Sequence, residues 1–182
     1  MIYYHCSPTP GLTVLQPRKP ESFHKPAAVY LTTLLPMALM YGIRNYEYTY
    51  GYTREGQIYL DEYFPNALEL LYRGKSASLY LCSPMETKTT QIPNERISFE
   101  EVPVLEEISI PDVLEALLEQ ERLGKLIIHR YSTLSQRKLD WILQAEADSI
   151  RELSLVGKDT PMAEYYRTHY PKSWAMVAAE QK

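Results

Sequence analysis

Residues 27–42 read AAVYLTTLLPMALMYG, and this stretch decides the fold because a strand pattern leads directly into a helix pattern. Residues 27–32 are a compact run of the β-branched, aromatic and apolar kind that is typical of a strand. Residues 33–41 have apolar side chains at helical spacing, with Thr33 placed to cap the helix and Pro36 in its first turn. Gly42 marks the expected end of this helix.

The chain before this segment predicts one strand and a long loop. Residues 2–5 read as a short strand that ends at a Ser-Pro-Thr-Pro-Gly run. Residues 8–26 hold five prolines, and a regular helix is excluded there because proline lacks an N–H and clashes with the preceding turn. Loops of this length in compact domains often carry function.

The chain after Gly42 predicts further strands. Residues 45–53 place tyrosine at every second position, which would put four rings on one face of a strand. Further predicted elements are a hairpin partner at 57–60, a short helix at 66–72, and strands at 76–82, 95–99 and 102–110.

The pattern becomes helical from Pro111 onward, with helices predicted at 111–123, from Ser135 to 153, and at 162–170. Residues 126–131 read as a short strand or a buried connector. We therefore expect an α+β fold in a single domain of residues 1–182. A split, mostly antiparallel β-core over residues 1–110 would carry a helical extension of residues 111–182 packed on it.

Composition narrows the function classes. The 182 residues carry a net charge of −4 without a basic run, which disfavours nucleic acid as the main partner. No apolar run approaches the roughly 20 residues of a membrane span, and the N-terminus lacks signal-peptide features. Two distant cysteines are too few for a disulfide framework or structural zinc site. We expect a cytoplasmic protein without membrane partners or a metal centre.

Familiar catalytic motifs are missing from the sequence. It has no HExxH, GxGxxG, phosphate-binding loop or GxSxG. His5 and Cys6 are adjacent on a predicted strand and point to opposite faces, which disfavours a Cys–His pair. Glu95 shares a strand face with Ile97 and Phe99, so this carboxylate lies either at the strand edge or in a position to be used.

Three segments, in chain order, carry a family likeness: Tyr4-His5-Cys6-Ser7, then Val29-Tyr30-Leu31-Thr32 with the following helix, then Asn94-Glu95-Arg96-Ile97-Ser98. Together they resemble the ADP-ribosyltransferase fold in its His-Tyr-Glu branch, which includes the diphtheria-type toxins and poly(ADP-ribose) polymerases. The resemblance covers residues 2–110.

The resemblance implies that NAD is the substrate and lies in a cleft between two small sheets. His5, with Ser7 beside it on the first strand, would bind the dinucleotide, the imidazole bonding to the adenosine-side ribose. Tyr30 and Tyr41 would stack on the nicotinamide ring. Glu95 would bond to the nicotinamide ribose and stabilise the oxocarbenium-like sugar as nicotinamide leaves. ADP-ribose would pass to an unknown protein or small-molecule acceptor.

The sequence also departs from the family pattern. Cys6 stands where the family commonly has glycine, and Pro93 stands where the arginine-modifying branch has its first glutamate. Glu100 or Glu101 is an alternative to Glu95 as the acidic residue. The main alternative function is a non-catalytic nucleotide- or protein-binding module on the same scaffold, and a weaker one is RNA-end or tRNA processing.

Overall fold

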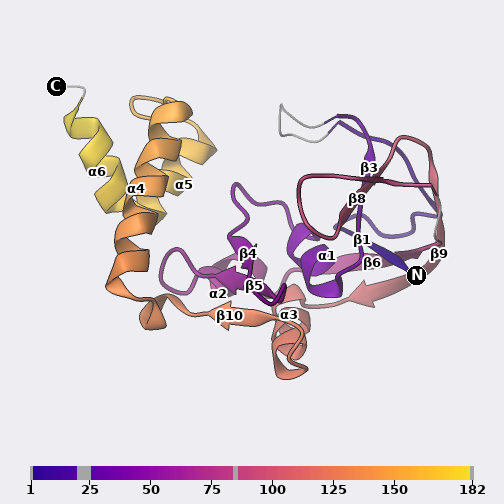
Figure 1. Ribbon diagram of the computed structural model, residues 1–182. Helices are drawn as coiled ribbons and strands as arrows, with labels where there is room; N and C mark the ends of the chain where they lie inside the picture. The colour runs from indigo at the N-terminus through magenta and orange to yellow at the C-terminus, as the bar shows by residue number, and fades with distance from the viewer. Residues whose placement is uncertain (1, 20–25, 84–85, 181–182) are drawn as a thin grey trace. The chain divides into compact units, whose positions relative to one another are not determined.

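The computed structural model describes residues 2–19, 26–83 and 86–180 (Figure 1). The fold is α+β and its larger sheet is mostly antiparallel, as the sequence predicts. In the described residues the strands are β1 (Tyr3–Ser7), β2 (Val14–Leu15), β3 (Val29–Thr32), β4 (Tyr50–Tyr52), β5 (Ile58–Asp61), β6 (Ala77–Cys82), β7 (Lys88–Thr89), β8 (Glu95–Ser98), β9 (Val102–Ile110) and β10 (Ile127–His129). The α-helices are α1 (Leu35–Tyr41), α2 (Ala67–Tyr72), α3 (Val113–Arg122), α4 (Gln136–Glu152), α5 (Pro161–His169) and α6 (Pro171–Ala179).

The larger sheet has the strand order β2-β9-β6-β1-β3-β8-β7, and a smaller sheet has the order β10-β5-β4. Strand β1 lies between β3 and β6, with His5 opposite Tyr80 and Tyr4 opposite Thr32. Strand β3 pairs on its other edge with β8, where Thr32 lies opposite Glu95. The register therefore brings the first strand, residues 29–32 and the glutamate strand together, although up to about 90 residues separate them along the chain (95 − 5 = 90).

The chain forms two compact units, residues 1–58 with 68–127, and residues 59–67 with 128–182. Helix α3 belongs to the first unit. Asp112 caps α3 by accepting hydrogen bonds from Leu114 N and Glu115 N, and its other oxygen accepts one from Gly74 N. One side chain thus starts the helix and ties it to the turn before β6.

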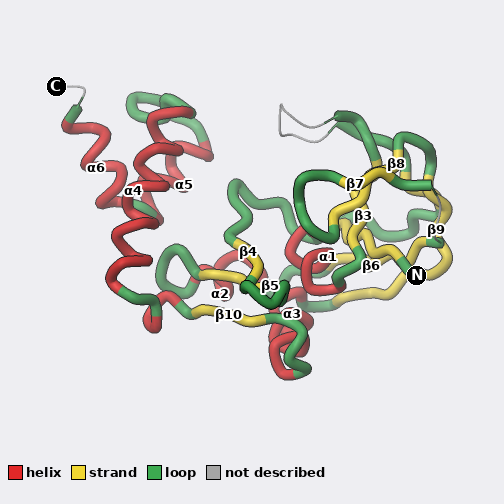
Figure 2. The backbone as a smooth tube through the Cα atoms, in the orientation of Figure 1, coloured by secondary structure: helices red, strands yellow, loops and turns green. Residues whose placement is uncertain are grey.

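The first unit has an apolar core on the larger sheet. Its members come from strands that are distant in sequence, namely Tyr3, Leu15, Val29, Leu31, Tyr80, Cys82 and Val102. Helix α1 contacts both β1 and β3 (Figure 2). It buries Met37, Leu39 and Met40 almost completely. Burying such side chains contributes roughly 1.5–3 kcal/mol each, so α1 is held firmly against the strands that carry the candidate site.

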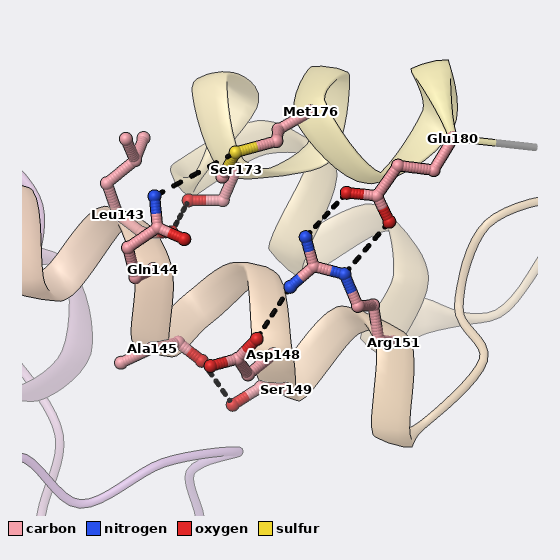
Figure 3. A network of polar contacts seen from close by, with 9 residues as sticks. All are labelled: Leu143, Gln144, Ala145, Asp148, Ser149, Arg151, Ser173, Met176 and Glu180. Carbon is pink, nitrogen blue, oxygen red and sulfur yellow. Dashed lines mark hydrogen bonds and ion pairs between the residues drawn. The ribbon is translucent and has the colours of Figure 1, made fainter.

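The second unit contains α4, α5 and α6. Helix α4 follows the predicted start at Ser135, whose side chain caps it by accepting a hydrogen bond from Lys138 N. Arg151 of α4 forms a two-pronged ion pair with Glu180, and Ser173 of α6 donates to Leu143 O at 2.9 Å (Figure 3). Tyr170 leaves helical geometry between α5 and α6, so the segment around Trp174 is a separate helix that the sequence analysis did not predict.

The predicted strand at 45–53 is wrong over most of its length, since only Tyr50–Tyr52 is extended. Tyr46 N donates to the side chain of Asn45, and Tyr48 stacks on Tyr41, so local and ring contacts override the two-residue period. The predicted Thr33 cap is also wrong. The residue before α1 is Leu34, and the Thr33 hydroxyl donates to Asn94 instead.

The long loop after β1 is confirmed as non-helical where it is described, although it includes the two-residue strand β2. Residues 20–25 of the predicted loop lie outside the described residues. A turn at residues 54–56 connects β4 to its predicted hairpin partner: Gly56 has a φ of +83°, and Thr53 N donates to Gln57 O at 2.8 Å.

Candidate functional site

One pocket in the first unit brings together four residues that the sequence analysis selected. It has a volume of about 190 Å³ and lies where β1, β3, α1 and the start of β8 meet. The four are His5, Tyr30, Tyr41 and Glu95. The rest of the lining is Tyr4, Cys6, Leu31, Thr32, Met37 and Ala38.

His5 is held by its backbone neighbour on the next strand. Its Nδ1 lies 2.9 Å from Tyr30 O, and because a carbonyl oxygen only accepts, Nδ1 must carry the hydrogen. Burial lowers the pKa of His5, and the charge of Arg18 adds to this, against the raising effect of the carbonyl. The imidazole is therefore neutral at pH 7, and its Nε2 is left as a hydrogen-bond acceptor.

Glu95 is only 4% exposed and begins strand β8. Its position is fixed by the residue before it, because Asn94 adopts a left-handed φ of +65° and its carbonyl accepts a hydrogen bond from Thr33 N. Asparagine tolerates this conformation better than most residues. The tight turn places a buried carboxylate at the pocket, close to the entry of α1.

The negative charge of Glu95 reaches the surrounding phenols. Burial raises the pKa values of Tyr30, Tyr50 and Tyr52, and the charge of Glu95 contributes to each rise. The pKa of Tyr41 also lies well above its usual value, mainly through burial. These tyrosines thus stay protonated at neutral pH and surround one carboxylate with neutral aromatic rings, while the hydroxyls of Tyr30 and Tyr52 donate to backbone carbonyls.

Tyr41 is set in place by two other rings. It stacks on Tyr48 with a centroid distance of 4.5 Å, and its hydroxyl lies 3.0 Å from the hydroxyl of Tyr50. Tyr48 is anchored in turn by a hydrogen bond to Ile43 O. Tyr48 covers part of the Tyr41 ring, and the rest of that ring is the part that can face the pocket. The hydroxyl of Tyr30 donates to Pro26 O at 2.8 Å.

Cys6 does not supply a reactive thiol. Burial raises its pKa to about 12, so the thiolate that nucleophilic chemistry needs is scarce at neutral pH. Its sulfur packs beside the end of α1: a Cβ built on Gly42 would lie only 2.5 Å from Sγ. The Cys6 side chain therefore fills the space that Gly42 leaves.

The other selected residues lie elsewhere. Ser7 Oγ accepts a hydrogen bond from Thr9 N, and Ser7 does not line the pocket. Glu100 and Glu101 are exposed in the turn between β8 and β9 and do not line it either, which distinguishes them from Glu95. Sequence reasoning missed Met37 and Thr32, whose apolar and small-polar types are too common in buried elements to signal a site.

The geometry suits one flat ring with a polar edge. The lining is mostly apolar, with a few polar groups, which is usual for small-molecule sites. The volume is below the roughly 300–1,000 Å³ of typical ligand pockets, so it fits one ring-sized group rather than a whole dinucleotide. Within the described residues, no group of three or more His, Cys, Asp or Glu could hold a metal ion.

No helix in the described part of the chain is both long and apolar enough to cross a membrane. Comparisons of the chain with protein-family models, with curated proteins and with solved structures find no match. The resemblance to ADP-ribosyltransferases therefore stays a prediction.

Proposed function

We propose that the chain is an ADP-ribosyltransferase of the His-Tyr-Glu type, which cleaves NAD at the nicotinamide–ribose bond and passes ADP-ribose to a protein or small-molecule acceptor. One observation supports this most strongly: His5, Tyr30, Tyr41 and Glu95, chosen from separate segments of the sequence, line the same pocket.

The chemistry of these groups fits the proposal. Neutral His5 has an acceptor nitrogen for a ribose hydroxyl. Tyr30 and Tyr41 offer ring surface for the nicotinamide. As the bond from C1′ to the ring nitrogen breaks, its electron pair leaves with neutral nicotinamide and positive charge develops on the sugar. A buried carboxylate at Glu95 would stabilise that charge, and such preorganised electrostatic contacts are worth about 10²–10³ in rate.

Because the pocket is small, it would enclose only one end of the dinucleotide. The pocket fits the nicotinamide end, and the phosphates and adenosine would lie outside it. Cys6 remains a departure from the family pattern. Because the Cys6 sulfur packs beside Gly42 at the end of α1, the backbone of Cys6 would approach the amide group of the nicotinamide ring.

The test is nicotinamide release during incubation with NAD, with water as the default acceptor. We expect release by the wild-type chain and a loss of about 10²-fold or more in Glu95→Gln. Glu101→Gln is the matched control, since it removes an exposed carboxylate from the adjoining turn and should leave the rate within about twofold. Equal rates in wild type and Glu95→Gln would contradict the proposed role.

A non-catalytic nucleotide- or protein-binding module is the second candidate, because a pocket of about 190 Å³ could hold one ring of a nucleotide or one side chain of a partner without any reaction. Calorimetry separates the two functions. A module would bind a nucleotide or a protein partner without releasing nicotinamide, whereas absence of both NAD binding and turnover would exclude the enzyme.

A further inference from the structure

Strand β9 has an open edge along its second half, on the side that faces away from β6. We propose that this edge binds an extended, basic peptide segment of a protein partner, which adds to the larger sheet as a further strand. Among the described residues that line the candidate pocket, none belongs to β9, so the inference stands independently of the proposed function.

The edge is open because β2 pairs only with the beginning of β9. On one side, β9 pairs with β6 from Val104 to Ile110. On the other side, β2 pairs with Val102 and Pro103, and Val104 N donates to Thr13 O. In the part of the chain that the structure describes, no strand continues this pairing along residues 105–110.

Such an edge is a template for another strand. Alternate residues of an antiparallel strand direct both their N–H and their C=O to the same neighbour. Every second residue of the β9 segment that pairs with β6 therefore directs these groups away from β6. A row of backbone groups of this kind accepts an extended peptide by main-chain hydrogen bonding.

The loop before β2 does not cover this edge, because it is bonded to side chains on one face of the sheet. Gly11 N donates to the carboxylate of Glu107 at 3.1 Å, and Leu12 N donates to the hydroxyl of Tyr80 at 3.3 Å. The Tyr80 hydroxyl donates in turn to Thr9 O at 2.6 Å. Glu107 and Tyr80 lie opposite each other in the register, so their side chains share a face. The loop is thus held over that face, away from the backbone edge.

The side chains along the edge indicate the chemistry of the partner. Leu105 is 62% exposed and Ile108 is 38% exposed, so an added strand would find apolar surface for its own side chains. Glu106 lies between them and is exposed, and no described lysine or arginine forms an ion pair with it. A lysine or arginine of the partner opposite Glu106 would stabilise the ladder, as opposite charges do in cross-strand pairs.

A second copy of the chain fits this edge less well than a basic peptide. Each copy carries glutamate at positions 100, 101, 106 and 107 and has a net charge of −4. Two β9 edges side by side would bring the glutamates of both copies to one ladder, and like charges that face each other there are destabilising. Charge therefore favours a basic partner over self-association.

The experiment measures peptide binding by fluorescence anisotropy with three labelled probes. The first is a peptide of alternating lysine and valine, the second has glutamate in place of lysine, and the third is the lysine–valine peptide N-methylated at every residue. N-methylation keeps the charge and removes the N–H donors that pair with a strand. We expect the first probe to bind about tenfold more tightly than either of the others.

Two variants locate the binding. In Glu106→Lys the affinity for the lysine–valine peptide should fall about fivefold, because an attractive cross-strand pair becomes repulsive. Glu164→Lys is the matched control, since it makes the same change of charge at an exposed residue of α5 and should leave the affinity within about twofold. Slower hydrogen exchange of residues 105–110 in the presence of the peptide would support the placement.

Several results would overturn the inference. Equal binding of the N-methylated probe would show that charge alone attracts the peptide, and equal affinity in wild type and Glu106→Lys would place it elsewhere. Absence of binding would exclude a basic strand at this edge. A dimer in analytical ultracentrifugation that Glu106→Lys alters and Glu164→Lys does not would assign the edge to a second copy. None of these results depends on turnover of NAD.

Discussion

Gly42 offers the sharpest test of how the site is packed. Its φ of −66° is ordinary right-handed backbone, so glycine is not required there for conformational freedom. It is required for space. A Cβ at this position would lie 2.5 Å from Cys6 Sγ, 3.2 Å from Leu39 O and 3.3 Å from Ala77 Cβ. Gly42→Ala must therefore displace the Cys6 sulfur, shift the end of α1, or do both.

Two opposing effects determine how much Gly42→Ala changes the free energy of unfolding. Replacing glycine by alanine at a compatible φ stabilises a protein by about 0.4–1 kcal/mol through the unfolded state. Overpacking a buried site costs about 1–3 kcal/mol, and Cys6 is only 5% exposed with a short side chain that has little freedom to move. We expect Gly42→Ala to lower the free energy of unfolding by about 1–2 kcal/mol.

The assay is urea unfolding followed by far-UV circular dichroism, because Trp141 and Trp174 both lie in the second unit and their fluorescence would report on that unit. The control is Cys6→Ala, which removes the clashing sulfur. The double variant should recover about 1 kcal/mol or more relative to the sum of the single variants, as expected for two residues in contact. A neutral or stabilised Gly42→Ala, or additive effects, would refute this packing.

Three further results are expected. Asp61→Asn should destabilise the second unit by about 2–4 kcal/mol in urea unfolding, because it removes a buried carboxylate that bonds to both His129 and Lys138, and an unchanged midpoint would contradict this. Burial lowers the pKa of His5 below 6.5, so the unfolded chain binds a proton at this residue more tightly than the folded chain does. The free energy of unfolding should therefore fall as the pH drops below about 6.5, and it should fall less steeply in His5→Gln. The same pH dependence in both proteins would contradict a buried neutral imidazole. Burial raises the pKa of both cysteine thiols, to about 12 and about 11, so a thiol reagent at pH 7.5 should react fully only after urea is added, and fast labelling of the folded chain would show otherwise.

Much of the fold could be predicted from local patterns. The strand–helix segment that ends at Gly42, the helix that begins after Ser135 and the strand Val102–Ile110 follow from the spacing of apolar residues, which acts within a few residues. The periodic spacing of apolar residues in these elements can be recognised in a single sequence without knowledge of the tertiary contacts.

The tyrosine-rich stretch could not be predicted in the same way. Its period of two is that of a strand, yet Tyr48 turns away to stack on Tyr41 and donates its hydroxyl to Ile43 O. Both contacts are with the end of α1 and the residues that follow it. Tertiary contacts of this kind leave no periodic signal, so the stretch became a support for the pocket instead of a sheet face.

The candidate site also depends partly on local sequence and partly on long-range contacts. The positions of His5, Tyr30 and Glu95 at one pocket depend on the pairing of β1 with β3 and of β3 with β8. Residue types and chain order suggested these positions, but the register that unites them is a long-range property. Ser7 illustrates the limit, because it lies on the same strand as His5 and yet outside the pocket lining.

We propose that one pocket receives the nicotinamide end of NAD, and a crystal structure of Glu95→Gln with NAD at saturating concentration tests this placement. We expect the nicotinamide ring against Tyr30 and Tyr41, with its ribose within hydrogen-bonding distance of residue 95. NAD bound away from these residues, or an unchanged pocket without the ring, would contradict it.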